Sequence, residues 1–197
     1  MDIRAHRGIA WIGALGTLIL LLMVAHAAGD PAEITIGFDP QHAYITTAPG
    51  AAVVQVTVDS AATDLKGFSF AIDFDETFIT PVSVLPGSLL TNAGCDYFFE
   101  WRNDGNPIWE PGIGDSVAVD GALLGDCSVA GPGSLFEVVF YWPGVPVSLT
   151  ELGCRLGGRL RNSANDSLFY TCEPGTVSVL AIHVEAMSWG RIKAEYR

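Results

Sequence analysis

The stretch Lys66-Gly67-Phe68-Ser69-Phe70-Ala71-Ile72-Asp73-Phe74-Asp75 has a large apolar residue at every second position and then ends in an acidic turn. Successive side chains of a strand point to opposite faces, so the three phenylalanines and Ile72 should line one face of a strand. The other face carries Gly67, Ser69, Ala71 and Asp73. We therefore expect an all-β sandwich in which these four residues form a candidate partner face.

Runs of β-branched and aromatic residues recur along the chain, with turn signals between them. The Pro-Gly pairs at 49–50, 86–87, 132–133 and 174–175 mark four of these turns, because proline presets one dihedral angle and glycine permits a positive φ. Many short strands between such turns predict a two-sheet sandwich or jelly roll. The expected strands are 34–38, 43–46, 52–59, 67–74, 78–84, 97–101, 116–119, 134–142, 147–156, 167–171 and 176–180.

The amino terminus has the pattern of a secretory signal peptide with a short apolar helix. Arg4 and Arg7 precede an apolar run over 9–24, and Ala25-His26-Ala27 has the small-x-small pattern that signal peptidase reads. The run is shorter than the roughly 20 residues of a membrane helix, which favours a cleaved signal at 1–27 over a retained anchor. We expect a bacterial protein, secreted or on the cell-envelope exterior, with no stable membrane span after cleavage.

The charge balance is strongly acidic. The chain has 22 Asp and Glu against 10 Lys and Arg, a formal net charge of −12. Binding to a phosphate backbone depends on clustered Lys and Arg, so this balance excludes nucleic acid as the partner.

All four cysteines, Cys95, Cys127, Cys154 and Cys172, follow the predicted signal peptide. Export to an oxidising compartment favours disulfides, and four cysteines allow three connectivities. We favour Cys95 with Cys127 and Cys154 with Cys172, because these pairs close the shortest loops. A site of four thiolates would need paired C-x-x-C spacing, which is absent, so no metal is expected.

The sequence also lacks a catalytic motif. Outside the signal peptide the histidines are His42 and His183, and neither G-x-S-x-G nor H-E-x-x-H occurs. Asp73 and Asp75 would lie about 7 Å apart on one strand face, a separation that suits a glycosidase pair. Acidic residues at a strand end usually form turns, and calcium is the next alternative. We expect no enzyme and no cofactor.

The polar loop Asn162–Ser167 is rich in oxygen ligands but lacks the spacing of a calcium loop. It is predicted to be a turn between Cys154 and Cys172.

Several segments, taken in order, resemble cohesin domains. The resemblance covers roughly 34–179, and we assign the domain to 28–182. Those that resemble the amino-terminal half are Ala43-Tyr44-Ile45, Pro49-Gly50, Val54–Val58, Gly67–Asp75 and Val82–Leu89; Gly131–Phe140 and Arg159–Asn162 resemble the strand pair that follows. The resemblance implies a jelly-roll sandwich of about nine strands without catalytic activity. Such a sandwich is similar to modules that bind dockerin domains in cellulose-degrading assemblies, and to carbohydrate-binding folds.

In cohesins the strand that matches Lys66 to Phe74 commonly presents an Asn and an Asp, two residues apart, to the dockerin. Those places fall here on Gly67, which offers only backbone, and on Ser69, which offers only a hydroxyl. The resemblance thus implies a protein partner, dockerin-like or other, without dockerin recognition of the familiar kind.

A row of aromatic residues suggests a polysaccharide as the alternative partner. Tyr97, Phe99 and Trp101 alternate along a predicted strand, and Trp109 follows the next turn. Rings in a flat row stack on sugars in many carbohydrate-binding modules, so Tyr97, Trp101 and Trp109 are candidate carbohydrate-binding residues. We favour the other interpretation, in which these rings fill the core beneath the Cys95–Cys127 loop, since mid-strand aromatics are usually buried.

The residues 183–197 form a basic and aromatic tail. Trp189, Ile192 and Tyr196 lie three and four residues apart, the spacing of one face of a short helix. The tail is either a frayed terminus or a displayed peptide that an envelope component or a partner groove recognises. The second alternative would make the chain a structural envelope protein addressed by its tail.

Overall fold

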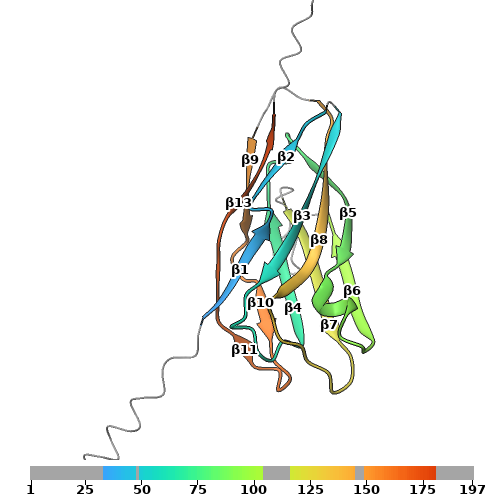
Figure 1. Ribbon diagram of the computed structural model, residues 1–197, viewed down its shortest axis with the longest axis vertical. Coiled ribbons are helices and arrows are strands. Elements are labelled where there is room, and N and C mark those ends of the chain that lie inside the picture. Colours follow the sequence, from blue (N-terminus) through green and yellow to red (C-terminus); the bar gives the residue numbers. More distant parts are fainter. Residues whose placement is uncertain (1–32, 48, 104–115, 145–148, 181–197) are drawn as a thin grey trace, which may run out of the picture. The chain divides into compact units, whose positions relative to one another are not determined.

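Two β-sheets pack face to face in the computed structural model, which describes residues 33–47, 49–103, 116–144 and 149–180 (Figure 1). The first sheet has the order β12 (Tyr170–Cys172), β1 (Ile34–Asp39), β3 (Gly50–Val58), β8 (Gly133–Trp142) and β5 (Thr80–Pro86). The all-β sandwich predicted from the sequence is confirmed.

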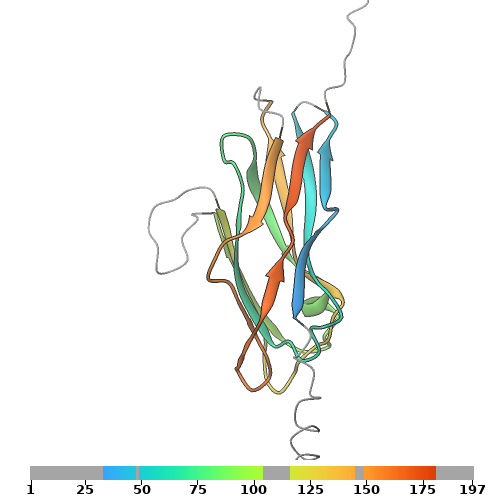
Figure 2. The same cartoon turned by 90° about the vertical axis from the view of Figure 1, so that its left-hand side faces the viewer.

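The second sheet has eight strands. Six follow the order β11 (Ser167–Leu168), β10 (Arg159–Arg161), β4 (Gly67–Asp73), β9 (Leu149–Cys154), β13 (Gly175–Val179) and β2 (His42–Ile45), and β7 (Ser116–Leu123) joins β4 to β6 (Tyr97–Arg102). Figure 2 shows the side on which β9, β13 and β2 run next to one another.

The strand β4 lies in the interior of the eight-stranded sheet. It pairs with β7 along its whole length, with β10 at its start and with β9 at its end. All its backbone neighbours are therefore strands, and only its outward side chains can meet a partner.

The predicted alternation of β4 is confirmed. Phe68, Phe70, Ile72 and Phe74 are all buried. The ring of Phe68 stacks on Phe136 of β8, with centroids 5.8 Å apart, and Phe74 meets Phe140 edge-on at 5.4 Å. These ring pairs join the two sheets across the core, where such contacts add about 0.5 to 1.5 kcal/mol beyond area burial.

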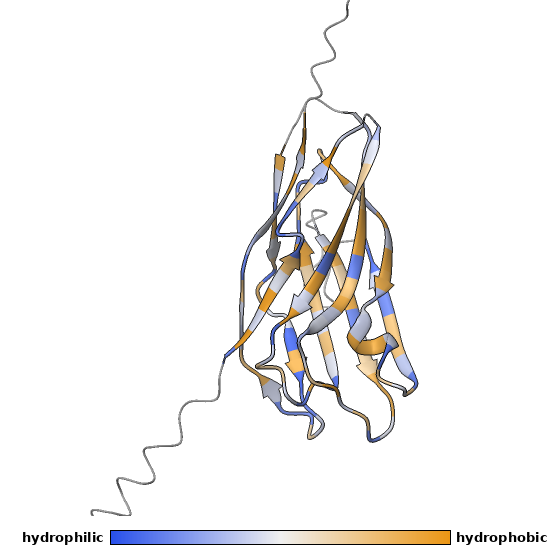
Figure 3. Cartoon of the chain, viewed as in Figure 1, coloured by the Kyte–Doolittle hydropathy of each residue, from blue (hydrophilic) through white to orange (hydrophobic). Residues whose placement is uncertain are grey.

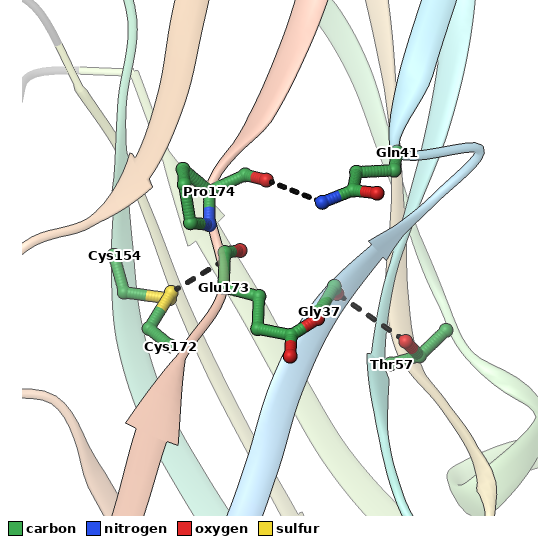
Figure 4. Close-up of a disulfide and its surroundings, with 7 residues drawn as sticks. All are labelled: Gly37, Gln41, Thr57, Cys154, Cys172, Glu173 and Pro174. Carbon is green, nitrogen blue, oxygen red and sulfur yellow. Dashed lines mark hydrogen bonds between the residues drawn. A yellow bond between two sulfur atoms is a disulfide. The ribbon is translucent and has the colours of Figure 1, made fainter.

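Both predicted disulfides are present. Cys95 bonds Cys127, and Cys154 bonds Cys172, with sequence separations of 32 and 18. The second joins β9 of one sheet to β12 of the other. Figure 4 shows that Gln41 reaches the carbonyl of Pro174 beside this bond, with Nε2 and O 3.3 Å apart. The same view shows the Thr57 hydroxyl donating to the carbonyl of Gly37 at 3.3 Å.

The structure has thirteen strands among the described residues, against eleven expected from the sequence pattern and about nine implied by the resemblance. One of them, β10, lies in none of the expected ranges. The predicted strand 167–171 is two short strands, β11 and β12, because the chain passes from one sheet to the other at Phe169. A four-residue helix, α2 (Ser88–Thr91), was not predicted. One turn of helix is too short to produce a periodic pattern.

Part of the sequence-based predictions concerns residues outside the described ranges. These are the signal peptide at 1–27, Trp109, and the tail with Trp189, Ile192 and Tyr196. Among the described residues, no helix has the length and hydropathy needed to cross a membrane.

Candidate functional site

The outward side chains of β4 lie in register with those of three neighbouring strands. Gly67 lies opposite Ala122 of β7 and Arg161 of β10, and Ser69 lies opposite Asp120 and Arg159 in the same two strands. Beyond β7, the strand β6 pairs Phe98 with Ala122, Glu100 with Asp120 and Arg102 with Ala118. We call this surface the β4 face; it comprises Gly67, Ser69, Ala71, Asp73, Phe98, Glu100, Arg102, Ala118, Asp120, Ala122, Arg159 and Arg161.

The four residues that β4 contributes form the floor of this face. Gly67 and Ala71 are buried, and Ser69 and Asp73 are half-buried. Their small size leaves the longer side chains of β6 and β10 to form the walls. In Figure 3 the strand β10 alternates hydrophilic, hydrophobic and hydrophilic, because Leu160 faces the core between two arginines.

The first of two hollows in the β4 face is bounded by two ion pairs. Arg102 Nη2 lies 3.1 Å from Asp120 Oδ2, and Arg155 Nε lies 2.7 Å from Asp73 Oδ1. Both arginine side chains are mostly covered, with exposures of 30% for Arg102 and 16% for Arg155. These pairs hold the arginine side chains over the alanines of β4 and β7.

The second hollow, of about 480 Å³, lies between β4, β7 and β10. Arg159 and Arg161 line it together with Lys66, which precedes β4. Arg161 Nη1 donates to the carbonyl of Asn165 at 2.8 Å. This hollow brings together three cations, whereas the first is neutralised by carboxylates.

The turn that carries Asn165 closes the β10–β11 hairpin, as predicted for Asn162–Ser167. Asn165 has a φ of 67°, the left-handed conformation that asparagine tolerates in turns. The Asp166 amide donates to Asn162 Oδ1 at 2.7 Å, and the Ser163 hydroxyl donates to Asp64 Oδ2 at 2.7 Å. Hydrogen bonds from the hydroxyls of Ser128 and Ser163 hold the pKa of Asp64 below its ordinary value.

The chain resembles known proteins in structure, not in sequence. No family model matches the chain, and neither does any curated protein sequence. Among solved structures, a non-cellulosomal cohesin from the hyperthermophilic archaeon Archaeoglobus fulgidus is 19% identical with a TM-score of 0.56, covering 76% of this chain and 93% of its own. The third ScaC cohesin of Acetivibrio cellulolyticus, in complex with the ScaB dockerin, is 16% identical with a TM-score of 0.58, covering 75% and 99%. The seventh ScaB type I cohesin of Pseudobacteroides cellulosolvens is 13% identical with a TM-score of 0.58, covering 76% and 93%. The chain has the cohesin fold.

Within this cohesin fold, Asp73 and Asp75 have separate structural roles. Asp75 follows the end of β4, and its Oδ1 accepts hydrogen bonds from the amide and the hydroxyl of Thr77 at 2.8 and 2.6 Å. Asp73 pairs with Arg155. Asp75 is therefore a turn former, which was the favoured interpretation of this acidic pair.

Other groups suited to catalysis or metal binding are also used in the scaffold. His42 Nδ1 lies 2.8 Å from the Thr176 hydroxyl and joins β2 to β13. No three His, Cys, Asp or Glu side chains in the described ranges lie close enough together to hold a metal ion.

Of the candidate carbohydrate-binding residues, Tyr97 and Trp101 lie on the core side of β6. Tyr97 and Trp101 lie in register with the buried residues Leu123 and Val119. Trp101 and Phe99 are half-buried and pack against the core, while Tyr97 is 40% exposed. This geometry favours the core interpretation for Phe99 and Trp101, but not for Tyr97. The outward aromatic residue of β6 is Phe98, which is 46% exposed and lies on the opposite face of the strand from Tyr97, Phe99 and Trp101.

The sequence reasoning missed the side chains from β6 and β10 that surround the β4 residues. Register between strands far apart in the chain cannot be inferred from one strand's alternation. One signal was available: 155–161 contains three arginines, although the chain as a whole is acidic.

Proposed function

We propose that this chain is a non-catalytic interaction module that binds a protein partner, dockerin-like or other, through the β4 face. The observation that carries the proposal is the face itself, a floor of small residues on an interior strand, bordered by charged side chains of β6 and β10. A partner backbone can approach such a floor closely, and the bordering groups can fix its register. Solved proteins of the same fold include cohesins in complex with dockerins, which supports a protein partner.

The setting we propose is outside the cell, in a polysaccharide-related context. Two disulfides support this part of the proposal, because disulfides persist in oxidising compartments. The predicted signal peptide agrees with it.

The test is titration calorimetry of the full mature chain against a panel of dockerin domains and, separately, against cellulose and xylan fragments. We expect at least one protein to bind. Ala122→Arg places a long side chain over the floor beside Gly67 and should weaken that binding by about tenfold or more, equivalent to 1.4 kcal/mol.

Val53→Arg is the matched control, because Val53 is exposed on β3 of the opposite sheet. It adds the same side chain away from the β4 face and should leave the affinity unchanged. Equal affinity of the Ala122→Arg variant and the wild type, or binding to polysaccharide alone, would contradict the proposal.

A further inference from the structure

The basic residues of the described chain gather on the β4 face. Five of the ten Lys and Arg lie in the described ranges, and each of them lines one of the two hollows: Lys66, Arg102, Arg155, Arg159 and Arg161. Acidic residues instead occur in both sheets and in many connecting loops. The β4 face and its two hollows thus hold all five described cations beside three carboxylates, those of Asp73, Glu100 and Asp120, in a chain whose net charge is −12.

Three of the five cations, Lys66, Arg159 and Arg161, line the second hollow at the β10 side of this face, and its lining contains no carboxylate. Arg102 and Arg155 each pair with an aspartate, and Glu100 lies next to Asp120 at the β6 side. On β10, Arg159 is exposed, and Arg161 donates to a backbone carbonyl, a neutral acceptor that leaves its charge in place.

The spacing of the two β10 arginines suits a pair of carboxylates. They lie two residues apart on one strand, about 7 Å along it. Residues three or four apart on a helix have Cβ atoms about 5 to 6 Å apart, so two carboxylates on successive helical turns would lie within reach of both guanidinium groups. Arginine binds a carboxylate through two parallel hydrogen bonds, which adds geometric specificity to the charge.

An apolar residue next to the arginines favours a protein over an anionic polysaccharide. Leu156 is 98% exposed and lines the same hollow as Arg155. Phe98 is partly exposed on the opposite border of the face. Protein interfaces cover such residues with apolar side chains of the partner, which a polymer of uronic acids does not carry.

We propose that the β4 face binds an acidic protein segment, in which two carboxylates pair with Arg159 and Arg161 and an apolar side chain covers Leu156. This inference rests on the proposed function and specifies the chemistry of the partner.

The experiment uses a display library of small helical domains with randomised surface positions, selected for binding to the full mature chain. We expect selected binders to be enriched in Asp and Glu at their contact positions. The double variant Arg159→Ala with Arg161→Ala should weaken them by about tenfold or more, because it leaves their carboxylates without partners at the interface. Leu156→Ala should weaken them by a smaller factor.

Two control proteins accompany these variants. Arg159→Lys with Arg161→Lys keeps both charges and should recover part of the affinity, because lysine cannot form the bidentate contact. Val53→Glu with Val82→Glu lowers the net charge by the same two units at exposed positions of the other sheet, and should leave the affinity unchanged. Thermal unfolding of every variant verifies that it is folded.

Some outcomes would overturn the inference and leave the proposed function standing. One is a set of binders that require the β4 face, as judged with Ala122→Arg, but show no acidic enrichment or tolerate the loss of both arginines. Arginine-dependent self-association, measured by analytical ultracentrifugation, would identify a second copy of this chain as the occupant. If no selected protein depends on the β4 face, the proposed function fails as well, and arginine-dependent binding of polygalacturonate alone would indicate an anionic polysaccharide.

Discussion

Gly121 on β7 makes room for the aromatic ring of Phe68 beneath the β4 face. It lies in register between Phe68 of β4 and Phe99 of β6. A Cβ added at Gly121 would lie 2.4 Å from the nearest ring carbon of Phe68. Because Phe68 is itself stacked on Phe136 in the core, its ring cannot move away without disturbing the contact between the sheets.

We therefore predict that Gly121→Ala lowers the free energy of unfolding by about 1 to 3 kcal/mol, the usual cost of overpacking a core. Urea denaturation at neutral pH measures the change. Gly153→Ala is the matched control, since a Cβ at Gly153 on β9 would meet no atom within 4 Å. Equal stability of the two variants would show that the Phe68 ring has space that the structure does not indicate.

At the scale of elements, one disulfide closes the loop that presents the β10 arginines. Cys154 and Cys172 are 18 residues apart in the sequence, and Leu156, Arg159 and Arg161 all lie between them. The strands in this loop, β10 and β11, have only three and two residues. Such short strands depend on their tertiary connections, because they make few hydrogen bonds of their own.

Replacing both cysteines, Cys154→Ala with Cys172→Ala, should lower the free energy of unfolding by about 3 kcal/mol, from the chain entropy that an 18-residue loop regains. The amides of β10 should also exchange faster with solvent, whereas those in the β4–β7 pairing should keep their protection relative to the new global stability. Hydrogen exchange measured by NMR separates the two effects. The variant Cys95→Ala with Cys127→Ala is the control, and equal loss of protection at β10 in both variants would contradict this local role.

The short elements β10 and α2 could not be predicted from the sequence pattern, whereas the longer strand β4 could. Alternation over Lys66–Asp75 was sufficient to predict β4 and its inward phenylalanines, because seven consecutive residues carry a clear period. A run as short as β10 or α2 has no measurable period. The candidate face was therefore predicted from β4 alone, and its charged borders emerged only with the pairing of β4 to β10 and β7.

At the scale of the whole molecule, the acidic net charge and the cations of the second hollow act at different distances. An acidic partner that approaches from far away meets a chain of net charge −12 and is repelled. In contact, it meets Arg159 and Arg161. The Debye length is about 8 Å at physiological salt, so salt largely screens the repulsion between the distant partner and the chain. The arginine–carboxylate pairs that form in contact are screened much less.

We therefore predict that added salt speeds the dissociation of acidic binders without slowing their association. Between about 50 and 500 mM NaCl, the association rate constant should rise or stay constant, unlike the fall seen when opposite charges steer a complex together. The dissociation rate constant should rise as the arginine–carboxylate pairs weaken. Surface plasmon resonance over this salt range measures both rates.

In the Arg159→Ala with Arg161→Ala variant, the dissociation rate should lose most of its salt dependence while the association rate keeps its trend. A steep fall of the association rate with salt in the wild type would show instead that the cations of the second hollow control the field at long range.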